Sequence, residues 1–401
     1  MEIDIGRGKK GRRAYGFDDI AIVPSRRTRD PDDIDITWTL GPYRFDLPLI
    51  ASAMDGVVSP ETAALVNRLG GLGVLNLEGI WTRYEDADQQ LEKVAAAPGA
   101  KATAIMQEIY AEPVKPELIA QRIAEIKEQG AVACGSLTPQ RVRKYYEGAI
   151  DAGLDIMVIQ GTVISAEHVS TSAEPLNLKE FIAEVPVPAV VGGCASYATG
   201  LHLMRTGAVG VLVGVGPGAA CTTRGVLGIG VPQATAIADV AAARSQHMLE
   251  TGEYCNVIAD GGMRTGGDVS KAIACGADAV MIGSPLARAK EAPGRGFHWG
   301  MATFHPSLPR GARVSTLQDG TMEEILLGPA HENDGTFNLM GALRTSMATT
   351  GYEDIRSFQR AEVMVAPALQ HEGKRLQEEQ SVGMGSNGRA AVATGVGVAD
   401  D

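Results

Sequence analysis

One unit recurs along the chain and constrains its fold more than any other feature: a helix-like segment, a glycine, and a short aliphatic run ending in small residues. The copies read RLGGLGVLN, EQGAVACGS, AGLDIMVIQG, TGAVGVLVG and CGADAVMIG. We expect their glycines to lie just past helix ends, where a positive φ is needed; they are Gly70, Gly130, Gly153, Gly207 and Gly276. The aliphatic runs do not alternate with polar residues, which is typical of strands covered on both faces. The repeat therefore predicts parallel β/α units.

Adding LPLIASAM, VPAVVGGCAS and CNVIADGGM gives eight candidate strands. They lie near residues 48–54, 72–77, 131–136, 155–160, 187–192, 209–214, 255–260 and 278–283. Eight such strands favour a closed (β/α)8 TIM barrel, a fold that commonly exceeds 250 residues as one domain. An open doubly wound sheet stays open as an alternative, although an early GxGxxG with an acidic residue about twenty positions on is missing.

The remaining segments suggest a single catalytic domain over residues 1–355 with two additions. Residues 81–128 read as a helical insertion, and residues 285–341, rich in Gly, Pro, His and Arg, read as a long flap over one mouth of the barrel. Residues 356–401 form a C-terminal extension whose end, poor in bulky apolar residues, we expect to be disordered.

Charge and cysteine content exclude several classes of protein. A net charge of −12 argues against a general nucleic-acid-binding surface, because such a surface needs clustered cations. No apolar run approaches the roughly 18 residues of a membrane span, and the N-terminus lacks an apolar signal segment. The five cysteines show neither CxxC spacing nor the density of a disulfide scaffold. We therefore expect a cytoplasmic protein.

The stretch VGVGPGAACTTRG places Cys221 in a glycine-rich loop after a buried strand. Barrel enzymes carry their catalytic groups at this end of the strands, so the thiol is a candidate nucleophile. The alternative, a small buried cysteine in a turn, is weakened by the polar Thr222, Thr223 and Arg224 beside it.

The next two strands run into IADGGMRTGGD and VMIGSPLA. In barrels the last two strands commonly hold a phosphate with backbone amides, which would let an acidic chain bind an anionic nucleotide. Asp260 is then placed to accept the ribose hydroxyls, and the alternative for it is a loop-capping aspartate.

These three segments resemble the active-site loop, ribose strand and phosphate strand of the IMP dehydrogenase/GMP reductase family. FDDIAIVPSR, LPLIASAMDGV and GALRTSMATTGY are similar to further family segments, so the resemblance runs from about residue 15 to 355. It implies a cysteine that attacks purine C2 and a hydride that passes between C2 and a nicotinamide.

The resemblance also implies roles for individual residues. Cys221 matches the nucleophile and Thr223 a proton-relay threonine. Contacts to a GMP or IMP ligand are implied for Ser52, Met54, Gly218, Asp260, Gly262, Gly283, Ser284, Gly300 and Met301. Carbonyls of Gly216, Gly218 and Cys221 match a monovalent-cation site, such as one for K⁺, found in some members. The family further implies a homotetramer or homo-octamer.

Departures from the family pattern decide between its two reactions. The chain has no room for the paired CBS modules typical of dehydrogenases, and its flap offers Arg310 and Arg313 without the adjacent tyrosine that helps activate water. Losing a general base costs about 10²–10⁴-fold in rate. The sequence therefore favours a GMP reductase using NADPH, with NAD-dependent IMP dehydrogenase as the alternative and a catalytically silent, regulatory nucleotide-binding barrel as a third hypothesis.

The proton donor and the cofactor pocket are less well defined. We expect the flap acid that a reductase requires to be Glu324 or Asp319, the alternative being that both lie on an exposed flap face. Near the cofactor, Gln160 replaces an aspartate of relatives, Cys194 an asparagine, and Leu212 a lysine. We therefore expect the dinucleotide pocket to differ from that of relatives.

Overall fold

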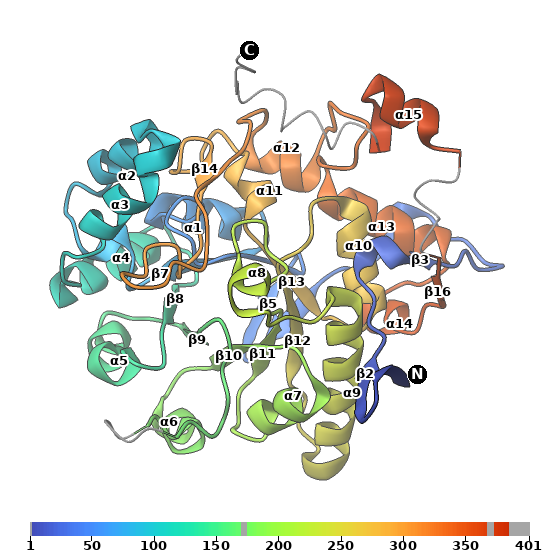
Figure 1. Ribbon diagram of the computed structural model, residues 1–401, viewed down its shortest axis with the longest axis horizontal. Coiled ribbons are helices and arrows are strands. Elements are labelled where there is room, and N and C mark those ends of the chain that lie inside the picture. The colour runs from blue at the N-terminus through green and yellow to red at the C-terminus, as the bar shows by residue number, and fades with distance from the viewer. Residues whose placement is uncertain (1, 170–174, 367–372, 385–401) are drawn as a thin grey trace.

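The computed structural model describes residues 2–169, 175–366 and 373–384, and these contain a closed barrel of eight parallel strands (Figure 1). The strands are β6 (Leu49–Ala51), β7 (Leu72–Asn76), β8 (Cys134–Leu137), β9 (Ile156–Gln160), β10 (Ala189–Cys194), β11 (Gly210–Val213), β12 (Asn256–Asp260) and β13 (Ala279–Ile282). All eight overlap the predicted strands, so the (β/α)8 fold is confirmed.

The barrel closes where its first strand meets its last. Leu49, Ile50 and Ala51 of β6 pair in parallel with Val280, Met281 and Ile282 of β13. This pairing leaves no free edge in the sheet and excludes the open doubly wound alternative. It also places the segment after β6 beside the segment after β13.

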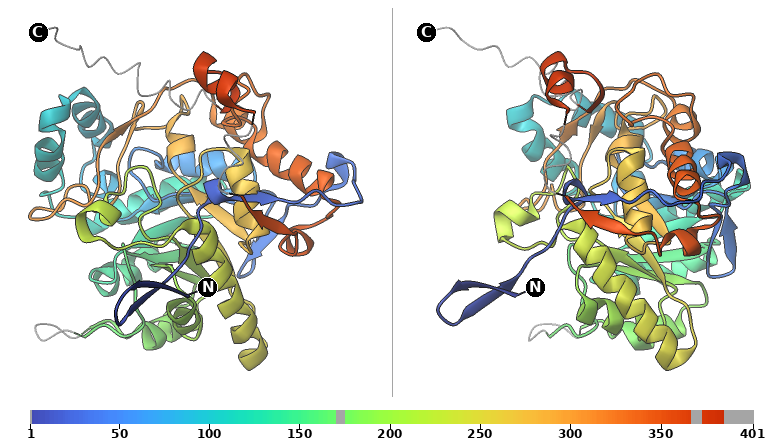
Figure 2. Two further views of the ribbon diagram at one scale, coloured as in Figure 1. Left: turned by 45° about the vertical axis from the view of Figure 1, so that its right-hand side comes forward. Right: turned by 90° about the vertical axis from the view of Figure 1, so that its right-hand side faces the viewer.

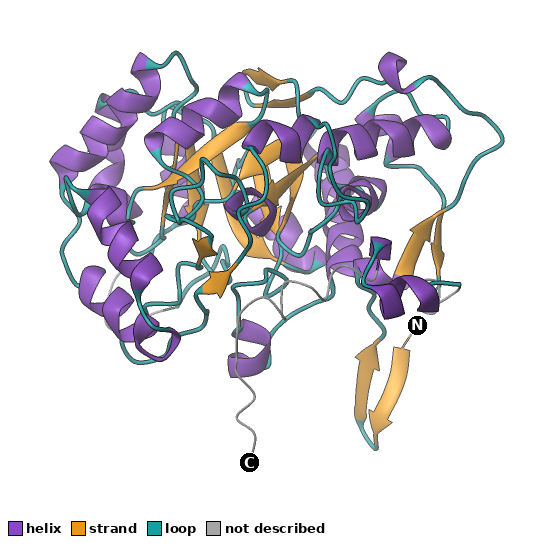
Figure 3. Cartoon of the chain, turned by 90° about the horizontal axis from the view of Figure 1, so that it is seen from above, coloured by secondary structure: helices purple, strands orange, loops and turns teal. Residues whose placement is uncertain are grey.

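Helices surround the strands, as the view from above shows (Figure 3). They are α1 (Pro60–Arg68), α4 (Pro116–Glu128), α5 (Val142–Asp151), α6 (Leu178–Glu184), α7 (Tyr197–Met204), α9 (Gln233–Thr251), α10 (Gly266–Ala274) and α13 (Leu339–Thr349). The five glycines predicted to need a positive φ all have one, from 72° at Gly130 to 115° at Gly276. The helix–glycine–strand reading of the repeat is thus confirmed.

Two apolar cores fill the molecule. Inside the barrel, Ile50, Val74 and Ile258 belong to a buried cluster that includes Trp38 and Phe45. Those aromatic residues come from the hairpin of β4 (Trp38–Leu40) and β5 (Tyr43–Phe45), which packs into the same interior. A second, larger core lies between strands and helices. The barrel is therefore a packed body, and a ligand site has to lie at a strand end.

The segment 81–128 is helical, but its parts differ in position. The 3-10 helix η3 (Ile80–Thr82), α2 (Ala87–Ala96) and α3 (Gly99–Ile109) form an excursion, whereas α4 packs against α1 and α5 as a regular member of the ring. The flap carries α11 (Ser284–Ala287), the short pair β14 (Phe297–His298) and β15 (Val314–Ser315), and α12 (Met322–Leu327). The division into a catalytic domain and an extension stays a prediction.

The chain ends add small elements outside the barrel. The hairpin of β1 (Glu2–Gly6) and β2 (Lys9–Arg12) projects from the body (Figure 2). Further along, β3 (Ile20–Ile22) pairs with β16 (Val363–Val365). The remaining short elements are η1 (Phe17–Asp19), η2 (Pro31–Asp33), α8 (Thr223–Leu227), α14 (Ile355–Phe358) and α15 (Arg375–Gln380). The stretch expected to be disordered lies mostly in 385–401, outside the described residues.

Two glycine substitutions test the turns that connect a helix to the next strand. Gly276→Ala combines a positive φ with a Cβ that would lie 2.5 Å from Cβ of Ala241, whereas a Cβ at Gly130 meets nothing within 4 Å. We expect Gly130→Ala to cost about 1 kcal/mol of unfolding free energy and Gly276→Ala about 3 kcal/mol, because overpacking adds to the backbone strain. Urea denaturation of the two variants measures both losses, and equal losses would contradict the packing argument.

Candidate active site

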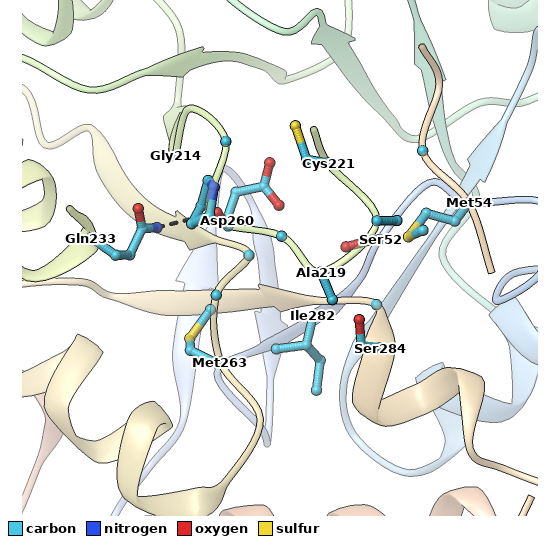
Figure 4. A pocket seen from close by; sticks show the side chains of 18 of the residues that line it. Ser52, Met54, Gly214, Ala219, Cys221, Gln233, Asp260, Met263, Ile282 and Ser284 are labelled. Atoms are coloured by element: carbon cyan, nitrogen blue, oxygen red, sulfur yellow. Dashed lines mark hydrogen bonds between the residues drawn. The ribbon is translucent and has the colours of Figure 1, made fainter. Parts of the chain in front are cut away.

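A cavity of about 510 Å³ opens at the carboxyl ends of the barrel strands. Figure 4 shows the side chains of Cys221, Asp260, Ser52, Met54 and Ser284 around it. The sequence-predicted residues that line the cavity are Ser52, Met54, Gln160, Gly216, Gly218, Cys221, Asp260, Gly262, Gly283, Ser284, Gly300 and Met301. Residues separated by up to 249 positions in the chain are thus brought to one place, between Ser52 and Met301.

Cys221 stands in the loop after β11, half-buried and facing the cavity. Its backbone N–H donates to the carbonyl of Gly218 at 3.0 Å, which tightens the loop. Its Sγ lies 3.2 Å from Oγ1 of Thr223, the fully buried first residue of α8. A thiol must lose its proton to act as a nucleophile, and this hydroxyl is in position to accept it.

The flap is docked against the Cys221 loop. The Ala312 N–H donates to the Ala220 carbonyl at 2.9 Å, and the Thr222 N–H donates to the Arg310 carbonyl at 3.3 Å. Arg310 also lines the cavity. Flap and nucleophile loop therefore form one wall in this structure.

Asp260 ends β12 with its carboxyl group inside the cavity wall. Burial raises its pKa to about 7, and this shift is opposed by a hydrogen bond from the Gln160 amide to Oδ2 at 3.2 Å. Near neutral pH the group therefore exists in both protonation states.

Gln233, at the start of α9, is a residue that the sequence reading missed. Its amide donates to the carbonyls of Val213 at 2.6 Å and Asp260 at 3.1 Å. It thereby fixes the spacing of β11 and β12, the two strands that carry Cys221 and Asp260. The signal in the sequence is weak, because a glutamine after a proline is also a common helix start.

Two glycine turns present unused backbone donors. The amides of Gly262, Gly283 and Ser284 have no acceptor among the described residues. A Cβ at Gly283 would lie 2.6 Å from Sδ of Met54, so a larger residue there would displace the Met54 side chain from the cavity wall. Neighbouring N–H groups that point at one space are suited to an anion such as a phosphate.

His298 is a second residue to which the sequence analysis gives no role, although it lies two positions before Gly300. It is fully buried in β14, lines the cavity, and its Nε2 lies 2.7 Å from Oγ of Ser284. Burial lowers its pKa to about 4, so the ring is neutral at physiological pH. It connects the base of the flap to the start of α11.

The two predicted flap acids lie elsewhere. Asp319 pairs with Arg288 at 2.5 Å. Glu324 accepts hydrogen bonds from the Thr321 backbone N–H at 2.7 Å and pairs with His331 at 2.9 Å, which together lower its pKa to about 2. Neither is among the described residues that line the cavity. As placed, Glu324 is a deprotonated helix cap and not a proton donor.

Two further expectations concern the rebuilt cofactor pocket and the cation. Cys194 ends β10 buried at 1% exposure and is not among the described residues lining the cavity, and burial raises its pKa to about 12. Gly216 and Gly218 lie in the Cys221 loop, where the Gly218 carbonyl already accepts the Cys221 N–H. The cation site at Gly216, Gly218 and Cys221 stays a prediction.

Thiol reactivity provides a test of how Cys221 is presented. Cys134, Cys194 and Cys255 are buried with raised pKa values, and burial raises the pKa of Cys275 to about 11. Since the thiolate is the reacting species, we expect iodoacetamide to modify Cys221 at least about tenfold faster than any other cysteine of the native protein at pH 8. Peptide mass spectrometry measures this, with Cys221→Ala as the control. A fast reaction that survives in the variant would contradict it.

Comparisons with known proteins agree with this geometry. A sequence profile of the IMP dehydrogenase / GMP reductase domain matches residues 14–312. An uncharacterized oxidoreductase of Mycolicibacterium smegmatis is 48% identical over 90% of this chain and 99% of its own length. An inosine-5'-monophosphate dehydrogenase of Borreliella burgdorferi is 31% identical over 77% of this chain and 78% of its own.

A solved structure is similar as well. The crystal structure of an IMP dehydrogenase/GMP reductase-like protein from Corynebacterium glutamicum superposes with a TM-score of 0.87 at 46% identity, covering 91% of this chain and 97% of the other. Within the described residues, no helix has the length and hydrophobicity needed to cross a membrane. With its barrel, its cysteine loop and these similarities, the chain belongs to the IMP dehydrogenase/GMP reductase family of oxidoreductases.

Proposed function

We propose that the protein is a GMP reductase, converting GMP, NADPH and a proton to IMP, ammonia and NADP⁺. The observation that carries the proposal is the position of Cys221: its sulfur faces the cavity, 3.2 Å from the Thr223 hydroxyl, on a loop covered by the flap. The Cys221 thiolate attacks C2 of the purine, the bond between C2 and the exocyclic amino nitrogen breaks, and ammonia leaves with a proton. Once C2 has received a hydride, which bound NADPH would supply, the C2–S bond breaks, the thiolate returns to Cys221, and IMP is released.

Binding of the nucleotide rests on backbone amides without a partner among the described residues and on the side chain of Asp260. The amides of Gly262, Gly283 and Ser284 donate to the phosphate, and Asp260 accepts from the ribose hydroxyls. Ser52 and Met54 flank the nucleotide from β6, and Gly300 and Met301 border the purine. These neutral donors bind a dianion inside a chain with a charge of −12, so affinity does not require a basic surface.

The flap supports reduction over hydrolysis. Dehydrogenation to XMP needs a water activated by an arginine with a tyrosine beside it, but Arg310 stands between Pro309 and Gly311. Arg313 is turned away, with its guanidinium 4.2 Å from the Phe297 ring and donating to the carbonyls of Val94 and Ala95. The intermediate thioimidate therefore lacks a base that would direct water to it.

We place the nicotinamide of the cofactor beside the purine. Gln160, at the end of β9, and the following Gly161 and Thr162 line the same cavity, and the cofactor would supply a hydride to C2 when bound. The exposed Arg224 and Arg264 also line it, Arg224 donating to the Val231 carbonyl at 2.8 Å and Arg264 lying 3.9 Å from Asp18. Two exposed guanidinium groups suit the extra phosphate of NADPH, and on this ground we choose NADPH over NADH.

An absorbance assay tests the direction of the reaction. We expect the reduced-nicotinamide band to fall when purified protein receives GMP and NADPH, and to stay at zero with IMP and NAD. Cys221→Ala should abolish turnover and keep nucleotide affinity within about tenfold, because phosphate and ribose contacts dominate ground-state binding. NADH production from IMP would instead establish the dehydrogenase, and tight GMP binding without turnover in either direction would favour a regulatory barrel.

Substitution of Asp260 tests the ribose contact. We expect Asp260→Ala to weaken GMP binding by about 2 kcal/mol or more, since a pair of charge-assisted hydrogen bonds is lost. Because burial raises the pKa of Asp260 to about 7 and only the carboxylate accepts both hydroxyls, wild-type affinity should fall as the pH drops from 8 to 6.

Calorimetric titration with GMP at both pH values measures these effects. Asp260→Asn is the matched control, since its amide keeps the size of the side chain and does not titrate. An affinity unchanged in Asp260→Ala would remove the residue from the ribose site.

A further inference from the structure

A series of buried hydrogen bonds connects the cavity wall, the helical insertion and the flap. Asp55 follows Met54, a cavity residue, and its own side chain is 1% exposed. Its Oδ2 accepts hydrogen bonds from the Tyr110 hydroxyl and from the Ile80 N–H. The Tyr110 oxygen in turn accepts from Trp299 Nε1 at 2.8 Å. Tyr110 directly follows α3, whereas Trp299 follows β14 in the flap.

The same tyrosine also holds the flap by its ring. Phe304 stacks on Tyr110 with ring centroids 3.6 Å apart and planes 4° from parallel. Trp299 and Phe304 bracket Gly300, Met301 and Ala302, which line the cavity. Both ends of this cavity-lining segment are therefore fixed by one residue of the insertion.

Other hydrogen bonds also join the insertion to the flap. The Arg313 guanidinium donates to the carbonyls of Val94 and Ala95 near the end of α2, where helix carbonyls lack intrahelical partners. The Gln107 amide donates to the His305 carbonyl at 3.1 Å. Figures 1 and 2 show the flap running alongside α2 and α3. The excursion after β7 thus provides the surface against which the flap packs.

We propose that Tyr110 is a positioning residue: it anchors flap residues 299–313 to the helical insertion and thereby holds the purine-facing segment and the Cys221 loop in register. The far end of the same flap segment completes the link, because Arg310 and Ala312 make backbone hydrogen bonds to Thr222 and Ala220 on either side of Cys221. A displacement of the flap is transmitted to the nucleophile loop. The part of this inference that concerns purine chemistry rests on the proposed function.

Removing one hydroxyl isolates this role. Tyr110→Phe keeps the stacking on Phe304 but leaves the buried Trp299 N–H without its acceptor and Asp55 without its phenol donor. The phosphate and ribose contacts are untouched. We expect kcat to fall about tenfold and KM for the nucleotide to change less than about threefold, because misplacement by an ångström acts on the reacting geometry.

Trypsin cleavage measures how often the flap detaches, and it does not depend on enzyme turnover. Arg310 and Arg313 lie in the anchored segment, so we expect cleavage after them to be at least about fivefold faster in Tyr110→Phe, since proteolysis follows the open population. Tyr84→Phe is the matched control: Tyr84 lies in the same excursion and its hydroxyl donates to the Ile109 carbonyl at 2.9 Å. In the Tyr84→Phe variant, the rate of flap cleavage and kcat should stay within about twofold of the wild-type values.

Two outcomes would overturn the proposal: flap cleavage in Tyr110→Phe at the wild-type rate, or equal changes in Tyr110→Phe and Tyr84→Phe. If Tyr110→Phe fails to fold, Phe304→Leu removes the stacking from the half-buried flap side and should accelerate the same cleavages. Cleavage is measured without nucleotide, and kcat with whichever nucleotide pair the wild type turns over. Failure of the GMP reductase assignment therefore leaves this test intact.

Discussion

The backbone pairing of β6 with β13 closes the barrel and thereby fixes the relative positions of all eight strand ends. By joining the first strand to the last, it sets Ser52 and Met54 beside Gly283 and Ser284 in the wall of the cavity. The fit is close, since a Cβ at Gly283 would lie 2.6 Å from Sδ of Met54 and would displace that side chain. Every other feature of the site is arranged around a face that this closure creates.

On that face, the strands supply fixed groups and the loops supply adjustable ones. Asp260 ends a strand, and Gln233 ties its carbonyl to that of Val213 on the neighbouring strand. Cys221, by contrast, lies on a loop. Its sulfur contacts the Thr223 hydroxyl, and its two neighbours form backbone hydrogen bonds with the flap. In the proposed reaction the nucleophile must approach and then leave a substrate carbon, which suits a loop, whereas the proposed ribose contact lies at a strand end fixed by hydrogen bonds.

The helical insertion gives the flap a second support. After β7 the chain forms α2 and α3, and the flap is tied to this excursion through Tyr110, Gln107 and Arg313. The flap is therefore held from two sides, by the Cys221 loop and by the insertion.

The barrel and most of the cavity lining could be predicted from local features of the sequence. Glycine positions and aliphatic runs are local signals, and strand ends in a parallel barrel necessarily share one face, so Cys221, Asp260 and the glycine turns could be predicted together. The family resemblance added Ser52, Met54, Gly300 and Met301 residue by residue.

Which side chains are already engaged by other residues became visible in the folded structure. Asp319 and Glu324 look available in the sequence but are held by Arg288 and His331, and Cys194 ends its strand on the buried side. His298, Gln233 and Tyr110 carry no local pattern, because their roles come from contacts between segments up to 189 positions apart, such as that between Trp299 and Tyr110. Burial and long-range hydrogen bonding are properties of the folded chain, and no local pattern of residues encodes them.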